Sequence, residues 1–176
     1  MNRNKGFSMV EVIIVVVIIG IVSTGVMIGL SSVNRNNTDE GFTALASSID
    51  TARYKTLSSE NTSLYLYTDD GYYYSCIYNG TTKEKITEKL FSCNIPVYVA
   101  DKTRNISVTV DKDHYIDWVE GEDFVPVMKL TFDKSTGQMK ELITPSGSFS
   151  NQTLELYSDN GNKKLCIYKN GRTKVE

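Results

Sequence analysis

Apolar and polar residues follow three different patterns along this chain, and each pattern predicts a different structure. Residues 12–30 carry no charged side chain, and this run matches the about 20 residues that a membrane-spanning helix needs. Arg3 and Lys5 precede the run, and the next charged residue after it is Arg35. Because basic residues stay on the cytoplasmic side, we expect residues 7–30 to cross the cell membrane once, with a cytoplasmic N-terminus.

The second pattern is that of an amphipathic helix. Five apolar residues beyond the first run recur at the spacing of one helix face: Phe42, Leu45, Ala46, Ile49 and Ala52. Thr38 or Asp39 could cap this part, so residues 7–58 are predicted to form one long helix, continuous or interrupted. Its first half is expected to be transmembrane, and its second half is expected to lay the apolar stripe on a sheet.

From residue 59 the pattern changes to short strands and turns. "SLYLY" and "YYYSCIY" flank Asp69-Asp70-Gly71 and predict an antiparallel hairpin. Residues 111–123 are predicted to be an acidic loop or a poorly formed strand. Further strands are predicted at residues 106–110, 127–132, 153–157 and 165–168 and in the last few residues. We therefore expect an α+β fold, with a long N-terminal helix packed on the antiparallel β-sheet of a globular, β-rich head formed by residues 59–176.

A weak internal repeat with a spacing of ninety residues relates two parts of the head. "LYLYTDDGYYYSCIY" aligns with "LELYSDNGNKKLCIY", and both two similar hairpins and a duplication would explain the match. The alignment makes Cys76 and Cys166 equivalent, so a disulfide between them is a candidate. Cys93 is the third cysteine, which leaves two states open: one disulfide with one thiol, or three buried thiols.

Glu11 stands at the start of the apolar run, where a carboxylate is costly. An acid costs about 2.5–3.5 kcal/mol at the middle of a membrane and less near its edge. A secretory signal peptide would have a shorter apolar core, and Ser23-Thr24-Gly25 makes only a mediocre cleavage site. A plain single-pass anchor fits the length of the run but leaves Glu11 unexplained. Glu11 therefore needs a compensating partner.

The segment "KGFSMVEVIIVVVIIGI" resembles the prepilin leader and methylation motif of type IV pilins and type II secretion pseudopilins. The resemblance implies that a prepilin peptidase cuts after Gly6, removes residues 1–6 as a leader peptide and methylates Phe7. It also implies that Glu11 meets the N-terminal amine of a neighbouring subunit, and that this desolvated pair sets the register of the incoming helix. An intersubunit amine would thus be the partner that the carboxylate needs.

The same resemblance implies the pilin fold and a set of partners. These partners are other pilin subunits, the prepilin peptidase, the membrane before assembly, and the assembly platform and ATPase of the pilus machinery. The implied final location is a filament at the cell surface. One departure from the family is Ile28, where a proline is common. Gly25 and Gly29 flank this position and could loosen the helix there, though more weakly.

The layout of the whole chain resembles that of the H-type pseudopilins and their minor-pilin relatives. Ala52-Arg53 matches the pair that ends their long helix, and Gly171-Arg172-Thr173-Lys174 matches their C-terminal glycine turn and basic residue. DNA-uptake minor pilins of this layout grip DNA through a similar glycine-arginine motif. Arg172 and Lys174 are therefore candidate DNA-binding residues, although two cations supply few phosphate contacts.

Charge and side-chain chemistry narrow the function further. The net charge is −2 and the basic residues are scattered, so no broad nucleic-acid surface is evident. His114 lies among acids, but Tyr115-Ile116 breaks the spacing of a calcium-binding loop. The sequence has no nucleophile–base signature, phosphate-binding loop or dinucleotide motif. We therefore expect no catalytic residues, no metal and no cofactor, and do not expect an enzyme.

The expected function is that of a minor pilin-like structural subunit of a type IV pilus. The alternative is a pseudopilin of a type II secretion or competence (DNA-uptake) apparatus, with a DNA- or surface-binding tip. Both functions involve assembly through the N-terminal helix, and DNA is the less favoured partner because the chain is acidic.

Overall fold

The computed structural model describes residues 9–58, 62–80, 84–101, 104, 106–110, 112–116, 124–159 and 161–176, with the backbone alone at 22–32, 34 and 84. The chain divides into two compact units, Met1–Arg35 and Asn36–Glu176. Helix α1 (Met9–Ser58) begins in the first unit and ends in the second. All of the strands that the structure describes belong to the second unit.

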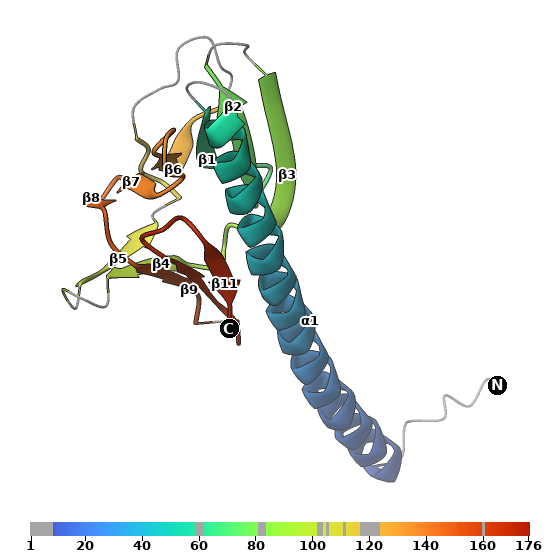
Figure 1. The fold of residues 1–176 in the computed structure, drawn as a ribbon. Helices are drawn as coiled ribbons and strands as arrows, with labels where there is room; N and C mark the ends of the chain where they lie inside the picture. The colour runs from blue at the N-terminus through green and yellow to red at the C-terminus, as the bar shows by residue number, and fades with distance from the viewer. Residues whose placement is uncertain are drawn as a thin grey trace. The chain divides into compact units, whose positions relative to one another are not determined.

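The strands form two antiparallel sheets (Figure 1). The six-stranded sheet has the order β3-β2-β1-β6-β7-β8, and the five-stranded sheet has the order β11-β10-β9-β4-β5. The predicted α+β class with antiparallel pairing is confirmed, and it is compatible with a pilin-like fold. The strands are β1 (Thr62–Asp69), β2 (Tyr72–Asn79), β3 (Glu84–Ser92), β4 (Val97–Asp101), β5 (Ile106–Val110), β6 (Pro126–Phe132), β7 (Met139–Thr144), β8 (Gly147–Ser150), β9 (Leu154–Tyr157), β10 (Lys164–Ile167) and β11 (Thr173–Val175).

Within the second unit, α1 contributes one face to the hydrophobic core. The five residues of the predicted stripe are all buried, and they belong to one cluster with inward residues of both sheets. Phe42 packs on Phe91 of β3 with ring centroids 5.5 Å apart. Gly41 permits this approach, since a Cβ there would lie 2.2 Å from the Phe91 ring. The helix therefore docks through close packing rather than through polar contacts alone.

Asp39 does not cap a helix, because α1 continues through it without a break. Its Oδ1 instead accepts hydrogen bonds from the backbone N–H groups of Asn162 and Lys163, both at 2.9 Å. These residues lie in the loop between β9 and β10. At the β11 edge of the same sheet, Thr173 Oγ1 donates to Asp50 Oδ2 at 3.0 Å, and Figure 1 shows β11 beside α1. The carboxylates of Asp39 and Asp50 thus attach the five-stranded sheet to α1 through hydrogen bonds.

The predicted hairpin over the tyrosine-rich segment is present as β1–β2. Asp70 and Gly71 connect the strands with φ angles of 43° and 77°. Two successive residues with positive φ are typical of the two-residue turn that matches the twist of a hairpin. The strands predicted at 106–110, 127–132, 153–157 and 165–168 correspond to β5, β6, β9 and β10.

Four strands are absent from the sequence-based prediction: β3, β4, β7 and β8. β3 and β8 are the edges of the six-stranded sheet. β3 reads "EKITEKLFS", and charged residues of this kind protect an exposed edge against further pairing. Such a charged segment lacks the apolar alternation by which a strand is recognised, which explains why β3 was not found.

Candidate functional site

The two predicted processing residues, Gly6 and Phe7, lie outside the described residues. The cleavage and methylation expected there therefore stay predictions. The first predicted assembly residue that the structure describes is Glu11, in the first turn of α1. A carboxylate at this end of a helix is favoured by the partial positive charge of the helix N-terminus.

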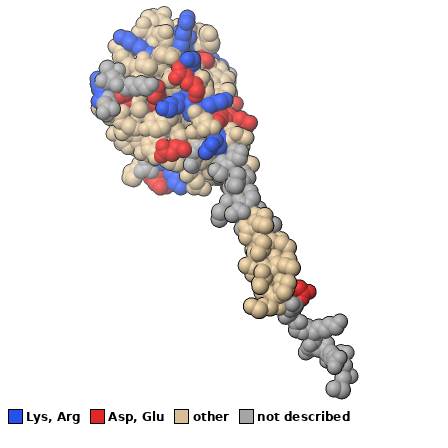
Figure 2. All heavy atoms as spheres, turned by 90° about the horizontal axis from the view of Figure 1, so that it is seen from below, with Lys and Arg blue, Asp and Glu red and all other residues tan. Residues whose placement is uncertain are grey.

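An apolar surface surrounds Glu11 on the helix. The side chains of Met9, Val10, Val12, Ile13, Ile14, Val15, Val16, Val17, Ile18, Ile19 and Ile21 are each at least 50% exposed. Figure 2 shows the described part of this unit as almost wholly uncharged, whereas basic and acidic side chains intermix over the visible face of the second unit. An apolar surface this extensive is typical of an interaction site rather than of surface facing water.

Among the described residues, no helix is both long and apolar enough to cross a membrane. The membrane span predicted at residues 7–30 is therefore not confirmed.

The structure does not form the predicted disulfide. Cys76, Cys93 and Cys166 are all present as thiols. Cys76 lies on β2 and packs with Tyr65, Tyr78 and Phe124 in a small cluster separate from the main core. Cys166 lies on β10 between two residues of the main core. Since side chains alternate between the faces of a strand, both thiols point away from the core that the two sheets share, and the prediction of a bond between them is corrected.

The C-terminal glycine of the predicted DNA-binding motif has a structural role. Gly171 has a φ of 78°, and a Cβ there would lie 2.1 Å from the carbonyl oxygen of Gly137. The same carbonyl accepts a hydrogen bond of 2.8 Å from Arg53 Nε. Arg53 therefore joins the end of α1 to the turn before β7. The turn before β11, which contains Gly171, packs against that same turn.

A backbone hydrogen bond also joins the turns before β7 and β11, since the N–H of Met139 donates to the carbonyl of Lys169 at 3.1 Å. We call the three residues Arg53, Gly137 and Gly171 the arginine–glycine clamp. It connects the helix with both sheets. The sequence points to Arg53 only through a resemblance in layout, because no local pattern relates it to residues more than eighty positions away.

The two candidate DNA-binding cations have different surroundings. Lys174 on β11 donates from Nζ to Glu176 Oε1 at 2.7 Å, and this hydrogen bond raises the pKa of Lys174 above its ordinary value. Arg172 is exposed beside the strand, with its backbone N–H donating to Asn170 Oδ1 at 3.1 Å. The acid next to Lys174 offsets its charge, so the pair offers one uncompensated cation rather than two.

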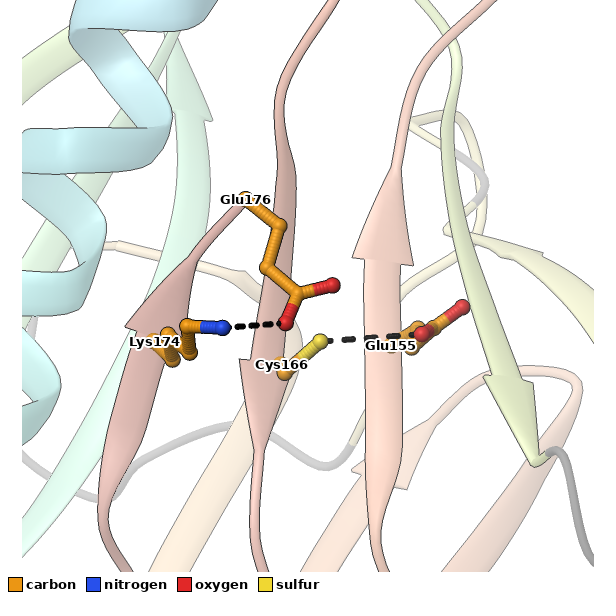
Figure 3. A network of polar contacts seen from close by, with 4 residues as sticks. All are labelled: Glu155, Cys166, Lys174 and Glu176. Atoms are coloured by element: carbon orange, nitrogen blue, oxygen red, sulfur yellow. Dashed lines mark hydrogen bonds and ion pairs between the residues drawn. The ribbon is translucent and has the colours of Figure 1, made fainter.

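Lys174 also belongs to a row of polar side chains across the outer face of the five-stranded sheet. Figure 3 shows Glu155 on β9, Cys166 on β10 and Lys174 on β11 side by side, with Glu176 just after the end of β11. Cys166 Sγ donates to Glu155 Oε1 at 3.6 Å, and both side chains are buried. This row explains where the Cys166 thiol points.

No group of three histidine, cysteine, aspartate or glutamate side chains that could hold a metal ion comes together among the described residues. His114 is exposed, and residues 111 and 117–123 of the acidic segment lie outside the description. The Asp133 carboxylate, in the turn before β7, accepts hydrogen bonds from residues of that same turn. Side-chain hydrogen bonds from Ser135 and Thr136 lower its pKa to about 2.

A family model described as the prokaryotic N-terminal methylation motif matches residues 1–27. No curated protein and no solved structure shows significant similarity to the chain. The match contains Gly6, Phe7 and Glu11 and supports a type IV pilin-like prepilin. It indicates a pilin- or pseudopilin-like protein that is processed by prepilin peptidase, and the motif implies a membrane-anchored, pilin-like protein.

Proposed function

We propose that this chain is a minor pilin-like structural subunit of a type IV pilus, without enzymatic activity of its own. The observation that carries the proposal is Glu11, one carboxylate in the first turn of a helix whose neighbouring described side chains are apolar and exposed. The methylation motif over residues 1–27 supplies the expected context. Within a filament, such helices bury each other's apolar surface.

Processing after Gly6 would give Phe7 a new N-terminal amine, four residues before Glu11. An amine from a neighbouring subunit would neutralise the Glu11 carboxylate in an apolar bundle. A lone charge buried without its partner is destabilised by about 3–5 kcal/mol. The ion pair thus allows an incoming helix to enter in one axial register only. The peptidase, the assembly platform and an ATPase are the proposed partners in this process.

The experiment replaces Glu11 with alanine and measures the subunit in sheared surface filaments and in membranes. We expect Glu11→Ala to stay in the membrane fraction but to fall at least about tenfold in filaments, because a buried amine loses its counter-charge. Glu40→Ala is the matched control, since Glu40 is an exposed acid on the same helix. Equal incorporation of Glu11→Ala and Glu40→Ala would leave only a simple membrane anchor.

A pseudopilin of a type II secretion or competence apparatus is the alternative, since the methylation motif and Glu11 serve both assemblies equally. We do not extend the proposal to DNA capture. Gly171 is required by its contact with the Gly137 carbonyl, and Lys174 is paired with Glu176. Gly171 and Lys174 therefore have structural explanations that need no nucleic acid, and the one cation that remains, Arg172, supplies few phosphate contacts.

A further inference from the structure

A cavity of about 340 Å³ lies beside the end of β1 in the second unit. Aromatic side chains and a few polar groups surround it, namely Tyr67, Thr68, Asp69, Lys85, Tyr115, Phe124 and Val125. Asp69, Lys85 and Tyr115 are exposed, so a solute can reach the cavity from solvent. This size and this mixture of aromatic and polar groups are typical of a small-ligand site.

The aromatic part of the cavity is rigid because its rings pack on one another. Tyr67 stacks on Tyr74, with centroids 5.4 Å apart and planes 19° apart. Its ring also lies 4.9 Å from that of Phe124, which in turn contacts Tyr65 at 5.7 Å. Phe124 is only 5% exposed. The floor is therefore a fixed apolar surface, on which a ligand can bind without ordering these side chains first.

Tyr115 provides a second aromatic surface at the opening. Its side chain is 53% exposed. The next residue, Ile116, donates its backbone N–H to the carbonyl of Pro126 at 2.9 Å, so this segment is attached to the start of β6. An exposed ring that is held by its backbone can cover one face of a bound molecule.

The polar groups at the rim balance in charge. Lys85 Nζ lies 4.7 Å above the ring of Phe124. Asp69 supplies one carboxylate, whose negative charge balances the positive charge of Lys85. A nucleic acid would bring phosphates close to that carboxylate without an excess of cations to offset them. A neutral ligand that has both an apolar face and several hydroxyl groups suits the cavity better, because the rings take its C–H face and the rim exchanges hydrogen bonds with its hydroxyls.

We propose that this cavity binds one neutral pyranose unit of a glycan. Tyr115 stacks on the sugar ring, the edge of Tyr67 contacts it, Asp69 accepts hydrogen bonds from hydroxyl groups, and Lys85 donates one. The inference is independent of the proposed filament function, since it rests on the second unit alone. A subunit with this site would recognise a surface that carries neutral sugars.

The test uses the full chain in a zwitterionic detergent, because detergents with sugar headgroups would compete. Saturation-transfer NMR is recorded with a panel of methyl glycosides of neutral hexoses and N-acetylhexosamines. We expect transfer to the ring protons of at least one glycoside. Tyr115→Ala should weaken its binding by about fivefold through the lost stacking surface, and Asp69→Asn by about tenfold through the lost charged acceptor.

Tyr54→Ala is the control, since Tyr54 is 65% exposed on α1 and does not line the cavity. It should bind like the unaltered chain. Asp69→Asn keeps the size of the side chain, so it carries the test if Tyr115→Ala unfolds. The proposal is overturned if no glycoside binds, if both cavity variants bind as tightly as the control, or if a short oligothymidylate binds in a Tyr115-dependent manner while the glycosides do not.

Discussion

The β1–β2 and β9–β10 hairpins pair their strands in one register but differ in their outward side chains and in their connecting turns. Leu64 faces Ile77 in the first hairpin, and Leu154 faces Ile167 in the second. Each residue of the second pair lies ninety positions after its counterpart. All four side chains enter the same hydrophobic core. The internal repeat in the sequence is thus a repeat of strand pairing, with each hairpin contributing one sheet to the core.

The outward faces of the hairpins carry different chemistry. In the first hairpin, Tyr65 faces Cys76 under an aromatic cluster that continues to the cavity. In the second, Glu155 faces Cys166, and the row of polar side chains in Figure 3 extends from there to Lys174. The shared core requires aliphatic side chains at these four inward positions, whereas the outward positions have no common neighbour. This difference shows why the repeat preserves register and core but not the surface.

The largest expected effect tests whether the inward positions are equivalent. Leu64→Ala and Leu154→Ala should each lower the free energy of unfolding by about 2–5 kcal/mol, because both residues are fully buried and the truncation leaves a cavity. Urea unfolding of the full chain in detergent, followed by near-ultraviolet circular dichroism, measures the change.

Ile106→Ala is the control for these two variants, because Ile106 on an edge strand is 45% exposed. We expect it to change the free energy of unfolding by less than about 1 kcal/mol. A Leu154→Ala variant as stable as this control, beside a strongly destabilised Leu64→Ala, would show that the second hairpin does not share the core and would break the comparison.

The sequence could predict what depends on local pattern. Alternation revealed the two hairpins, and helical spacing revealed the stripe from Phe42 to Ala52, because each of these segments buries one face. The disulfide between Cys76 and Cys166 was wrong for a related reason. Cys76 and Cys166 occupy equivalent positions in the repeat, so each lies on the outward face of its own sheet. Because the hydrophobic core lies between the two sheets, these outward faces point away from each other and the two thiols cannot meet.

The parts of the candidate sites that the sequence could not predict depend on contacts between distant segments. The arginine–glycine clamp joins three segments, and the aromatic cavity joins β1 and β3 with the residues before β6. Neither has a spacing that can be recognised in the chain. The Glu11 segment is different, because its signal is a charge within one local apolar run. It could therefore be recognised from the sequence alone.

Substituting alanine for two glycines that have the same backbone conformation is expected to have a medium effect on the free energy of unfolding. Gly71, in the turn of the first hairpin, and Gly171, in the turn after the second, have φ angles of 77° and 78°. Alanine at either position should be destabilising by about 1–2 kcal/mol, since side chains disfavour this conformation. Gly71 has open space around its Cβ position, whereas a Cβ at Gly171 would meet the Gly137 carbonyl at 2.1 Å.

Gly171→Ala should therefore cost about 1–3 kcal/mol more than Gly71→Ala, because the turn must move to remove the overlap. The same urea titration gives both values, and Gly71→Ala is the matched control for backbone conformation. Equal destabilisation by the two substitutions would mean that the turns before β7 and β11 do not pack as described, and that the C-terminal glycine is retained for another reason.

The smallest expected effect on the free energy of unfolding comes from changing the loop that connects the strands of the second hairpin. The first hairpin closes through the two-residue Asp70-Gly71 turn, and the carbonyl of Gly71 accepts a hydrogen bond from the backbone N–H of Cys93 at 3.0 Å. The second has a longer loop, and Asp39 of α1 accepts hydrogen bonds from two of its backbone N–H groups. Asp39→Ala should lower the free energy of unfolding by about 1–2 kcal/mol, while Asp39→Asn should recover part of the loss because it keeps an acceptor oxygen.

Amide hydrogen exchange distinguishes a local effect of Asp39→Ala from a general loss of stability. The amides of Asn162 and Lys163 should exchange faster, because they lose their acceptor, while the amide of Tyr72 at the first hairpin should exchange as before. Faster exchange at both hairpins would mean that Asp39 supports the whole core. Unchanged exchange at Asn162 would contradict the attachment of the second loop to α1.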